Sequence, residues 1–306
     1  ADFSDTVGKI SVAQFLDVIE SPPTCRHIIE AWISNSYGAS IADLDARELQ
    51  TLWKQWTAGE VNFMFEKAGY IELLAEVCAD ALPAIQYTKP ISQIEYAENH
   101  VRARTPKGEV FEGNALVLTV PLGVLKKHFI TFSPPLPAPK TAAIECIGVG
   151  AGLKILLKFK ESFWDDNVGA IYGDGYISEF YPSAKEDEAI LTALVMGDNA
   201  MYLSNLTENE AIQTALQELD RIGNNTTASE LFEKGTRIDW TTMPFQWGAY
   251  SYPSTDSGQA RVDLAKPLPP LYFAGEATHT KGHIATVHGA LETAYRAVLE
   301  LLGRQG

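Results

Sequence analysis

The 306-residue chain is poor in cysteine. Cys25, Cys78 and Cys146 lie far apart, and no CxxC pair is present. Zinc ribbons and thioredoxin-like redox sites need such pairs, so the sequence excludes both. A disulfide framework is not expected in a chain of this length, and we expect the three cysteines to be small buried hydrophobic residues.

Basic residues are also scarce. Lys and Arg total 24 against 39 Asp and Glu, which gives a net charge of −15 at pH 7. Duplex binding requires a basic face that displaces counterions from phosphates, so we expect no nucleic-acid partner. The acidic balance weakly favours cationic small molecules.

Long apolar runs are missing as well. The longest, residues 115–125, contains Pro121 and Gly123, whereas a bilayer-spanning helix needs about 20 apolar residues. No signal-peptide pattern follows Ala1. We therefore expect no transmembrane segment and a soluble protein, with the cytoplasm favoured.

The 46% hydrophobic and 21% charged residues are typical of a folded globular chain. The length of the chain predicts about two domains.

Helical and strand-like patterns follow one another in a mixed order. Helical periodicity covers residues 1–60, and another helix follows Gly69. Strands are expected at 84–87, 91–96, 101–105, 109–112, 115–120, 153–159 and 189–196, with a hairpin turn at Lys107-Gly108 and a helix at 208–222. The order indicates two interleaved domains of mixed α/β and α+β character.

The most informative segment is a buried strand at 271–274, a loop at 275–282 and a helix at 286–302. Such a unit presents a ligand site at the carboxyl edge of a sheet, and the helix N-terminus favours negative charge. The helix carries one apolar stripe, formed by Val287, Leu291, Ala294, Val298 and Leu302. The alternative is a terminal helix simply packed on a sheet, with Glu276 as a solvated cap.

Four sequence blocks resemble the flavin-dependent amine oxidases, in particular the branch of polyamine and spermine oxidases and flavin-dependent histone demethylases. They are TVPLGVLKK with FSPPLPAPKTAAI (119–144), GVGAGLKILLKFKESFW (148–164), DWTTMPFQWGAYSYPSTDSGQ (239–259), and FAGEATH followed by TVHGA (273–290). The resemblance extends from about Gly69 to the C-terminus.

The resemblance implies FAD as cofactor and a role for particular residues. Lys154 matches the family lysine that holds a water near flavin N5. Gly275 and Glu276 match the ribose or pyrophosphate region, and Ile91 the residue whose backbone meets the adenine. The other flavin contacts implied are Trp240, Phe245, Thr286 and Val287, and the walls flanking the substrate amine are Tyr250 and Thr286.

Two of these assignments have plain structural alternatives. Lys154 stands among leucines, and a buried ammonium is costly without a partner. Strand alternation could instead place Lys154, Leu156 and Lys158 on a solvent face. The aromatic residues at 240–250 could equally be ordinary core.

The family's opening GxGxxG fingerprint is missing from this chain. The glycines at 148, 150 and 152 are no substitute, because Leu153 replaces the third glycine and a strand follows. The resemblance therefore implies an incomplete, doubly wound FAD-binding domain at 61–125 and 266–306. It is interleaved with a substrate domain of helices at 1–60 and mixed sheet at 126–265. We expect an N-terminal fragment or subunit carrying GxGxxG as partner.

The implied activity is FAD-dependent oxidation of a polyamine-like amine to an imine and then an aldehyde, with O2 reduced to hydrogen peroxide. One alternative is an L-amino-acid oxidase or related flavin oxidase, with Arg237 or Arg261 facing a substrate carboxylate. A second is a non-catalytic binding module that has lost the FAD fingerprint. No metal site is expected, because His279 and His288 match no zinc spacing and a capping or packing role is favoured.

Overall fold

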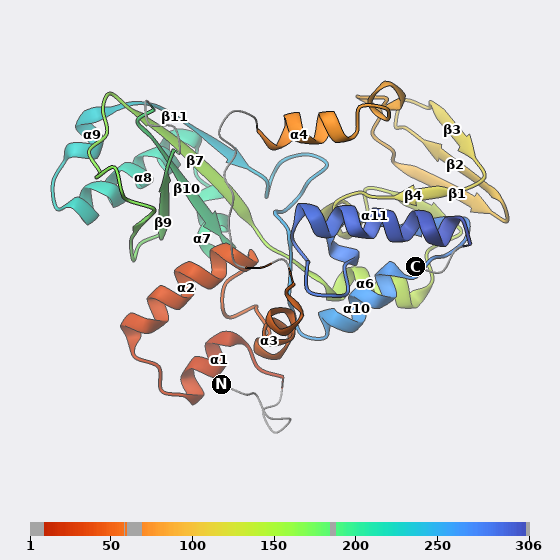
Figure 1. Cartoon of the computed structure of the whole chain (residues 1–306), viewed down its shortest axis with the longest axis horizontal. Coiled ribbons are helices and arrows are strands. Elements are labelled where there is room, and N and C mark those ends of the chain that lie inside the picture. The colour runs from red at the N-terminus through yellow and green to blue at the C-terminus, as the bar shows by residue number, and fades with distance from the viewer. Residues whose placement is uncertain (1–8, 58, 60–68, 184–187, 304–306) are drawn as a thin grey trace.

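The computed structural model describes residues 9–57, 59, 69–183 and 188–303. Two parts lie side by side (Figure 1), one built on an antiparallel sheet and the other on smaller sheets covered by helices. The predicted boundary between residues 60 and 61 lies outside the described residues.

The first part contains a five-stranded antiparallel sheet in the order β11-β7-β10-β9-β8. The strands are β7 (Gly152–Phe159), β8 (Ile171–Tyr172), β9 (Glu179–Pro182), β10 (Ile190–Met196) and β11 (Phe232–Asp239). Alternate residues of β7, from Leu153 to Phe159, are fully buried against helix α8 (Glu208–Gly223) and its neighbours α7 (Gly197–Ser204) and α9 (Thr227–Leu231). The opposite face of β7 does not belong to this core, so its side chains can contribute to a binding site.

Three helices close this part from below in Figure 1: α1 (Val12–Val18), α2 (Pro23–Tyr37) and α3 (Ala46–Gln55). Ser11 and Gln14 form a capping box at α1, and the Asp45 side chain accepts from the first amides of α3. The prediction of a helical N-terminal region is confirmed for the described residues.

The second part combines several small sheets. β1 (Gln93–Ala97), β2 (His100–Arg104), β3 (Val110–Gly113) and β5 (Thr131–Ser133) form a four-stranded sheet, and β4 (Leu116–Leu118) pairs in parallel with β13 (Leu271–Phe273). The helical elements are α4 (Tyr70–Val77), α5 (Leu122–Lys126), α6 (Ala138–Cys146), α10 (Ser257–Ala265), α11 (Val287–Leu301) and the short turns η1 (Leu82–Ala84) and η2 (Glu276–Thr278).

A short antiparallel ladder of β6 (Gly148–Val149) and β12 (Ser251–Tyr252) stands where the chain passes between the two parts. A Cβ on Gly150 would lie 1.5 Å from the carbonyl oxygen of Gly38, so this glycine permits close backbone contact. Strand β7 follows directly, as the sequence predicts, and these glycines do not open a helix.

Four expectations differ from the structure. Residues 84–87 form no strand, because the turn η1, which contains Pro83, extends to Ala84. Cys25 is exposed and the other two cysteines are partly exposed, so the prediction of buried cysteines is wrong. The apolar stripe of α11 faces outward, with Leu291 52% exposed, because Gly289, Thr293 and Ala297 form the packed face.

The fourth difference concerns the domain boundaries. Helices α6 and α10, expected in the substrate domain at 126–265, pack on each other and share one hydrophobic core with Ile94, Leu118 and Phe273. Residues 126–147 and 257–265 therefore pack with the second part, because their apolar side chains share one buried core with the side chains of its sheets.

Candidate active site

One cavity of about 520 Å³ lies between the two parts. It is lined from the first part by β7 and β10, and from the second by the ends of β4 and β13, the loops after them and the start of α11. Among the predicted site residues, those lining it are Lys154, Trp240, Tyr250, Gly275, Glu276, Thr286 and Val287. Residues that are more than 130 positions apart in the sequence, from Lys154 to Val287, therefore meet at one place.

The loop after β13 is held by Glu276. Its carboxylate accepts hydrogen bonds from the Ser251 amide (3.1 Å), the Ser251 hydroxyl (2.6 Å) and the Ala285 amide (2.7 Å). Gly275 precedes it at a φ of 117°, a conformation that favours glycine. Glu276 is thus an organised part of the cavity wall, and its interpretation as a solvated cap is wrong.

The N-terminus of α11 opens on the same cavity. Thr286 is the N-cap, and its hydroxyl oxygen accepts from the Gly289 amide at 3.0 Å. Thr286 and Val287 both line the cavity. The positive end of the helix dipole therefore favours negative charge on a group placed there.

Lys154 lies on the face of β7 opposite to the leucine core. Leu153 and Ile155 are fully buried, whereas Lys154 is partly exposed and lines the cavity. Its Nζ is 5.7 Å from the centre of the Trp240 ring. Alternation thus turns the ammonium away from the core and toward the cavity, so it needs no partner inside the leucine layer.

Tyr250 lines the cavity and is fixed by α2. Its hydroxyl donates to the carbonyl oxygen of Asn35 at 2.5 Å. Burial, assisted by the charge of Glu179, raises the pKa of the Tyr250 phenol, so it stays neutral. Tyr250 and Thr286 thus contribute to the same cavity from different parts of the fold.

Phe245 and Ile91 lie outside the cavity lining. Phe245 is 48% exposed and packs edge-to-face on Phe129 and Trp247. Ile91 packs against the core of the second part. The structure therefore does not bring these two residues together with the others.

Sequence reasoning missed several wall residues. Thr119, Val120, Pro121 and Gly123 line the cavity after β4, and Gln246 lies against Gly123. The block TVPLG at 119–123 carries the available signal, but the sequence pattern predicts only a strand at 115–120 there. Its position at the carboxyl end of a parallel strand is the physical reason for its role.

Neither arginine considered for a substrate carboxylate lines the cavity. Arg237 donates to the carbonyl oxygens of Leu203 and Leu206. Arg261 is buried and donates to Ser251 and Ala277, and burial, partly offset by Glu276 and Glu48, lowers its pKa to about 10. Both guanidinium groups have structural roles.

A membrane-spanning helix is not found in the part of the chain that the structure describes, since no helix there has the necessary length and apolar character.

A cavity at the carboxyl ends of parallel strands, with a helix N-terminus beside it, is the arrangement in which α/β proteins bind ligands. Residues 9–302 match the family model described as flavin containing amine oxidoreductase, and the chain belongs to that family. The expected fold class and the flavin cofactor are thereby confirmed.

Relatives by sequence include histone demethylase homologues and polyamine oxidases. The chain is 35% identical over 229 residues to lysine-specific histone demethylase 1 homolog 3 of Arabidopsis thaliana, covering 71% of this chain and 14% of the relative. It is 29% identical over 265 residues to the human peroxisomal N(1)-acetyl-spermine/spermidine oxidase, covering 72% of this chain and 52% of the relative. The chain thus spans only part of these proteins.

Solved structures show the same fold. Putrescine oxidase bound to putrescine superposes with a TM-score of 0.80 at 19% identity, covering 99% of this chain and 70% of that one. Cyclohexylamine oxidase from Brevibacterium oxydans gives a TM-score of 0.78 at 16% identity, covering 96% and 68%.

The residues present fit the flavin end of FAD. The α11 N-terminus, the ordered Glu276 and the Trp240 ring all line one cavity. The GxGxxG unit that would hold the pyrophosphate is not in the sequence.

Proposed function

We propose that this chain forms the substrate-binding and flavin-facing portion of an FAD-dependent oxidase of polyamine-like amines. The observation that carries the proposal is the meeting of Lys154, Tyr250, Glu276 and Thr286 around one cavity. The overall reaction is oxidation of the amine to an imine, hydrolysis to an aldehyde, and reduction of O2 to hydrogen peroxide.

Bound FAD supplies the two-electron oxidation, and the chain supplies binding and electrostatics. Tyr250 and Thr286 flank the neutral amine, and the mostly apolar wall excludes water. The N-terminus of α11 would stabilise negative charge on a flavin ring bound in the cavity. Lys154 holds a water that assists either the oxygen half-reaction or imine hydrolysis.

An N-terminal segment carrying GxGxxG completes the FAD site in this proposal. Support comes from apolar side chains left exposed on the second part, including Ile71 and Val77 of α4 and Leu291 and Tyr295 of α11. Within the described residues β13 pairs only with β4. Exposed apolar side chains and an open edge of a parallel sheet both favour a further packed segment.

A second candidate substrate is a methylated lysine in a peptide. It is favoured by the higher identity to the histone demethylase relative, 35%, than to the polyamine oxidase relative, 29%. A non-catalytic module is the remaining alternative, because the fingerprint is absent.

Reconstitution tests the proposal. The chain is co-purified with a segment carrying GxGxxG, and mass spectrometry confirms both polypeptides. We expect visible flavin absorbance, and hydrogen peroxide release with putrescine or spermidine in preference to a dimethyl-lysine peptide. Peroxide release with the peptide alone would favour the second substrate. A colourless complex after addition of FAD would support the non-catalytic module.

A further inference from the structure

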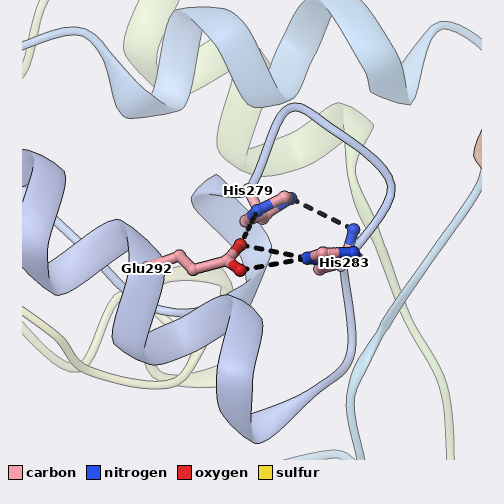
Figure 2. A group of neighbouring side chains, drawn as sticks. All are labelled: His279, His283 and Glu292. Carbon is pink, nitrogen blue, oxygen red and sulfur yellow. Dashed lines mark hydrogen bonds and ion pairs between the residues drawn. The ribbon is translucent and has the colours of Figure 1, made fainter. Parts of the chain in front are cut away.

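Two histidines share one carboxylate beside the cavity. Figure 2 shows His279 and His283, from the loop before α11, directed at Glu292 on that helix. His279 Nε2 lies 2.7 Å and His283 Nδ1 3.0 Å from the same Glu292 oxygen. Both histidines are buried. Sequence reasoning singled out His279 but missed these two partners.

Backbone contacts determine which nitrogen of His279 carries its proton. Nδ1 accepts hydrogen bonds from the amides of Lys281 (3.1 Å) and His283 (3.2 Å). A ring nitrogen that accepts from N–H groups carries no proton, so the proton of neutral His279 is on Nε2 and is donated to Glu292. His279 is therefore held in one neutral tautomer.

The rest of the cluster agrees with this assignment. Glu292 faces His283 Nδ1, and the Thr57 hydroxyl lies 3.0 Å from His283 Nε2. Because the carboxylate of Glu292 accepts, His283 carries its proton on Nδ1, and its Nε2 accepts from the Thr57 hydroxyl. Every polar atom in this chain of contacts has a complementary partner while both rings are neutral.

The same assignment argues against a metal ion. The candidate ligand atoms of His279, His283 and Glu292 lie within 4.8 Å of one another. A metal would require an unprotonated nitrogen facing Glu292 on each ring. His279 would then carry its proton on Nδ1, directly against two amide donors. The geometry favours a proton-bonded cluster.

The cluster is connected to the cavity wall through a short segment. The Thr286 hydroxyl donates to the His283 carbonyl oxygen at 2.8 Å. A Cβ on Gly289 would lie 1.9 Å from that oxygen, so the loop sits tightly on α11. Ala285 and Thr286 then line the cavity. The turn at 279–283 therefore helps to position this wall, together with the bond from the Ala285 amide to Glu276.

We propose that neutral His279 is a positioning residue for the cavity wall, and that its protonation releases residues 280–286. A second proton must enter at Nδ1, where it removes the acceptor used by Lys281 and His283. The loss of these two hydrogen bonds loosens the turn that places Thr286. The link to turnover rests on the proposed function, but the loop response itself does not require flavin.

The charged and titratable groups around His279 come from several elements. Glu292 and Arg296 belong to α11, and His283 to the same loop. Glu48 of α3 and Arg261 of α10 line, with His279, a small cavity of about 160 Å³. Burial lowers the pKa of His279 despite Glu292, which keeps the ring neutral around pH 7.

The lowered pKa of His279 determines how pH changes the stability of the ordered loop. An unconstrained histidine titrates at about pH 6.5. Because the folded pKa is lower, the released loop binds more protons as the pH falls through this value. Acidification therefore favours the released form, and the ordered loop is fully stabilised only above this range.

Hydrogen exchange of the full chain tests the proposal without cofactor. Protection factors of the Lys281 and His283 amides are measured between pH 8 and pH 5 and normalised to intrinsic exchange. We expect both to fall by about tenfold or more, corresponding to about 1.4 kcal/mol, while Ile155 and Leu157 in the β7 core stay protected. Unchanged protection at positions 281 and 283 would overturn the proposal.

Matched variants separate the positioning role from simple packing. In His279→Asn, the amide oxygen can replace Nδ1 as acceptor and cannot be protonated, so protection should persist and become independent of pH. His279→Leu should lose the protection of the Lys281 and His283 amides at all pH values. His128→Asn, at an exposed histidine, should behave as wild type. A pH response retained in His279→Asn, or stoichiometric Zn²⁺ binding that increases protection, would refute the mechanism.

Discussion

The Nζ atom of Lys154 lies 5.7 Å from the centre of the Trp240 ring. Lys154 is on β7, and Trp240 directly follows β11, the strand paired with β7. Strand pairing thus brings a cation and an aromatic face together at the cavity. This arrangement gives the lysine a defined position without an acidic partner in its own strand.

Replacing Lys154 tests its proposed role. We expect Lys154→Met in the reconstituted enzyme to slow flavin reoxidation by O2, or imine hydrolysis, by about 10²-fold, the lower end of a typical proton-transfer contribution. Stopped-flow measurement separates these steps from amine oxidation. Lys158→Met is the control, because Lys158 shares the strand face but pairs with Glu233. Full oxygen-dependent turnover in Lys154→Met would remove the role.

Gly123 supports the cavity wall by close backbone contact. A Cβ there would lie 2.3 Å from the Gln246 carbonyl oxygen and 2.5 Å from that of Trp247. We expect Gly123→Ala to lower the free energy of unfolding by about 1–3 kcal/mol. Gly169→Ala is the control, since nothing lies within 4 Å of its Cβ. Equal urea midpoints for the two variants would contradict the predicted contact.

Lys140 gives a pH-dependent prediction. Its ammonium donates to the backbone oxygens of Asp263, Leu264 and Lys266, and burial lowers its pKa to about 8. Between pH 8 and the unfolded value near 10.4, the unfolded chain binds more protons, so this residue's contribution to stability rises with pH.

Lys140→Met leaves three carbonyl oxygens without their donor, and we expect a loss of about 1–3 kcal/mol at pH 7. The stability difference from wild type should widen from pH 8 to pH 10 in urea unfolding. A difference that narrows over this range would show that the pKa of Lys140 is not lowered.

The outward stripe of α11 tests the proposed N-terminal partner. Leu291 and Tyr295 are 52% and 70% exposed, so aspartate at either position should change the stability of this chain by less than about 0.5 kcal/mol. We expect both variants to lose co-purification with the GxGxxG segment. Val18→Asp, at a position 70% exposed on α1, should retain it. Normal complex formation by Leu291→Asp and Tyr295→Asp would place the partner elsewhere.

Local pattern predicted much of the fold correctly. The alternation of β7 and the continuous apolar character of β4 predicted strands, because side chains of a strand point to opposite faces in turn. The strand–loop–helix at the C-terminus predicted a ligand site, and seven predicted residues line the cavity. Ile91 and Phe245 do not, since sequence position alone does not fix which way a loop or aromatic side chain turns.

The sequence by itself determined the elements, the mixed fold and the family, because these depend on local periodicity and on motifs that are contiguous in the chain. Tertiary structure decided which face of α11 is packed and where the face of β7 that carries Lys154 points. It also joined His279 and His283 to Glu292 and Thr57. These features depend on contacts between segments that are distant in the sequence. A local sequence pattern does not specify which element packs against which face of a helix or strand.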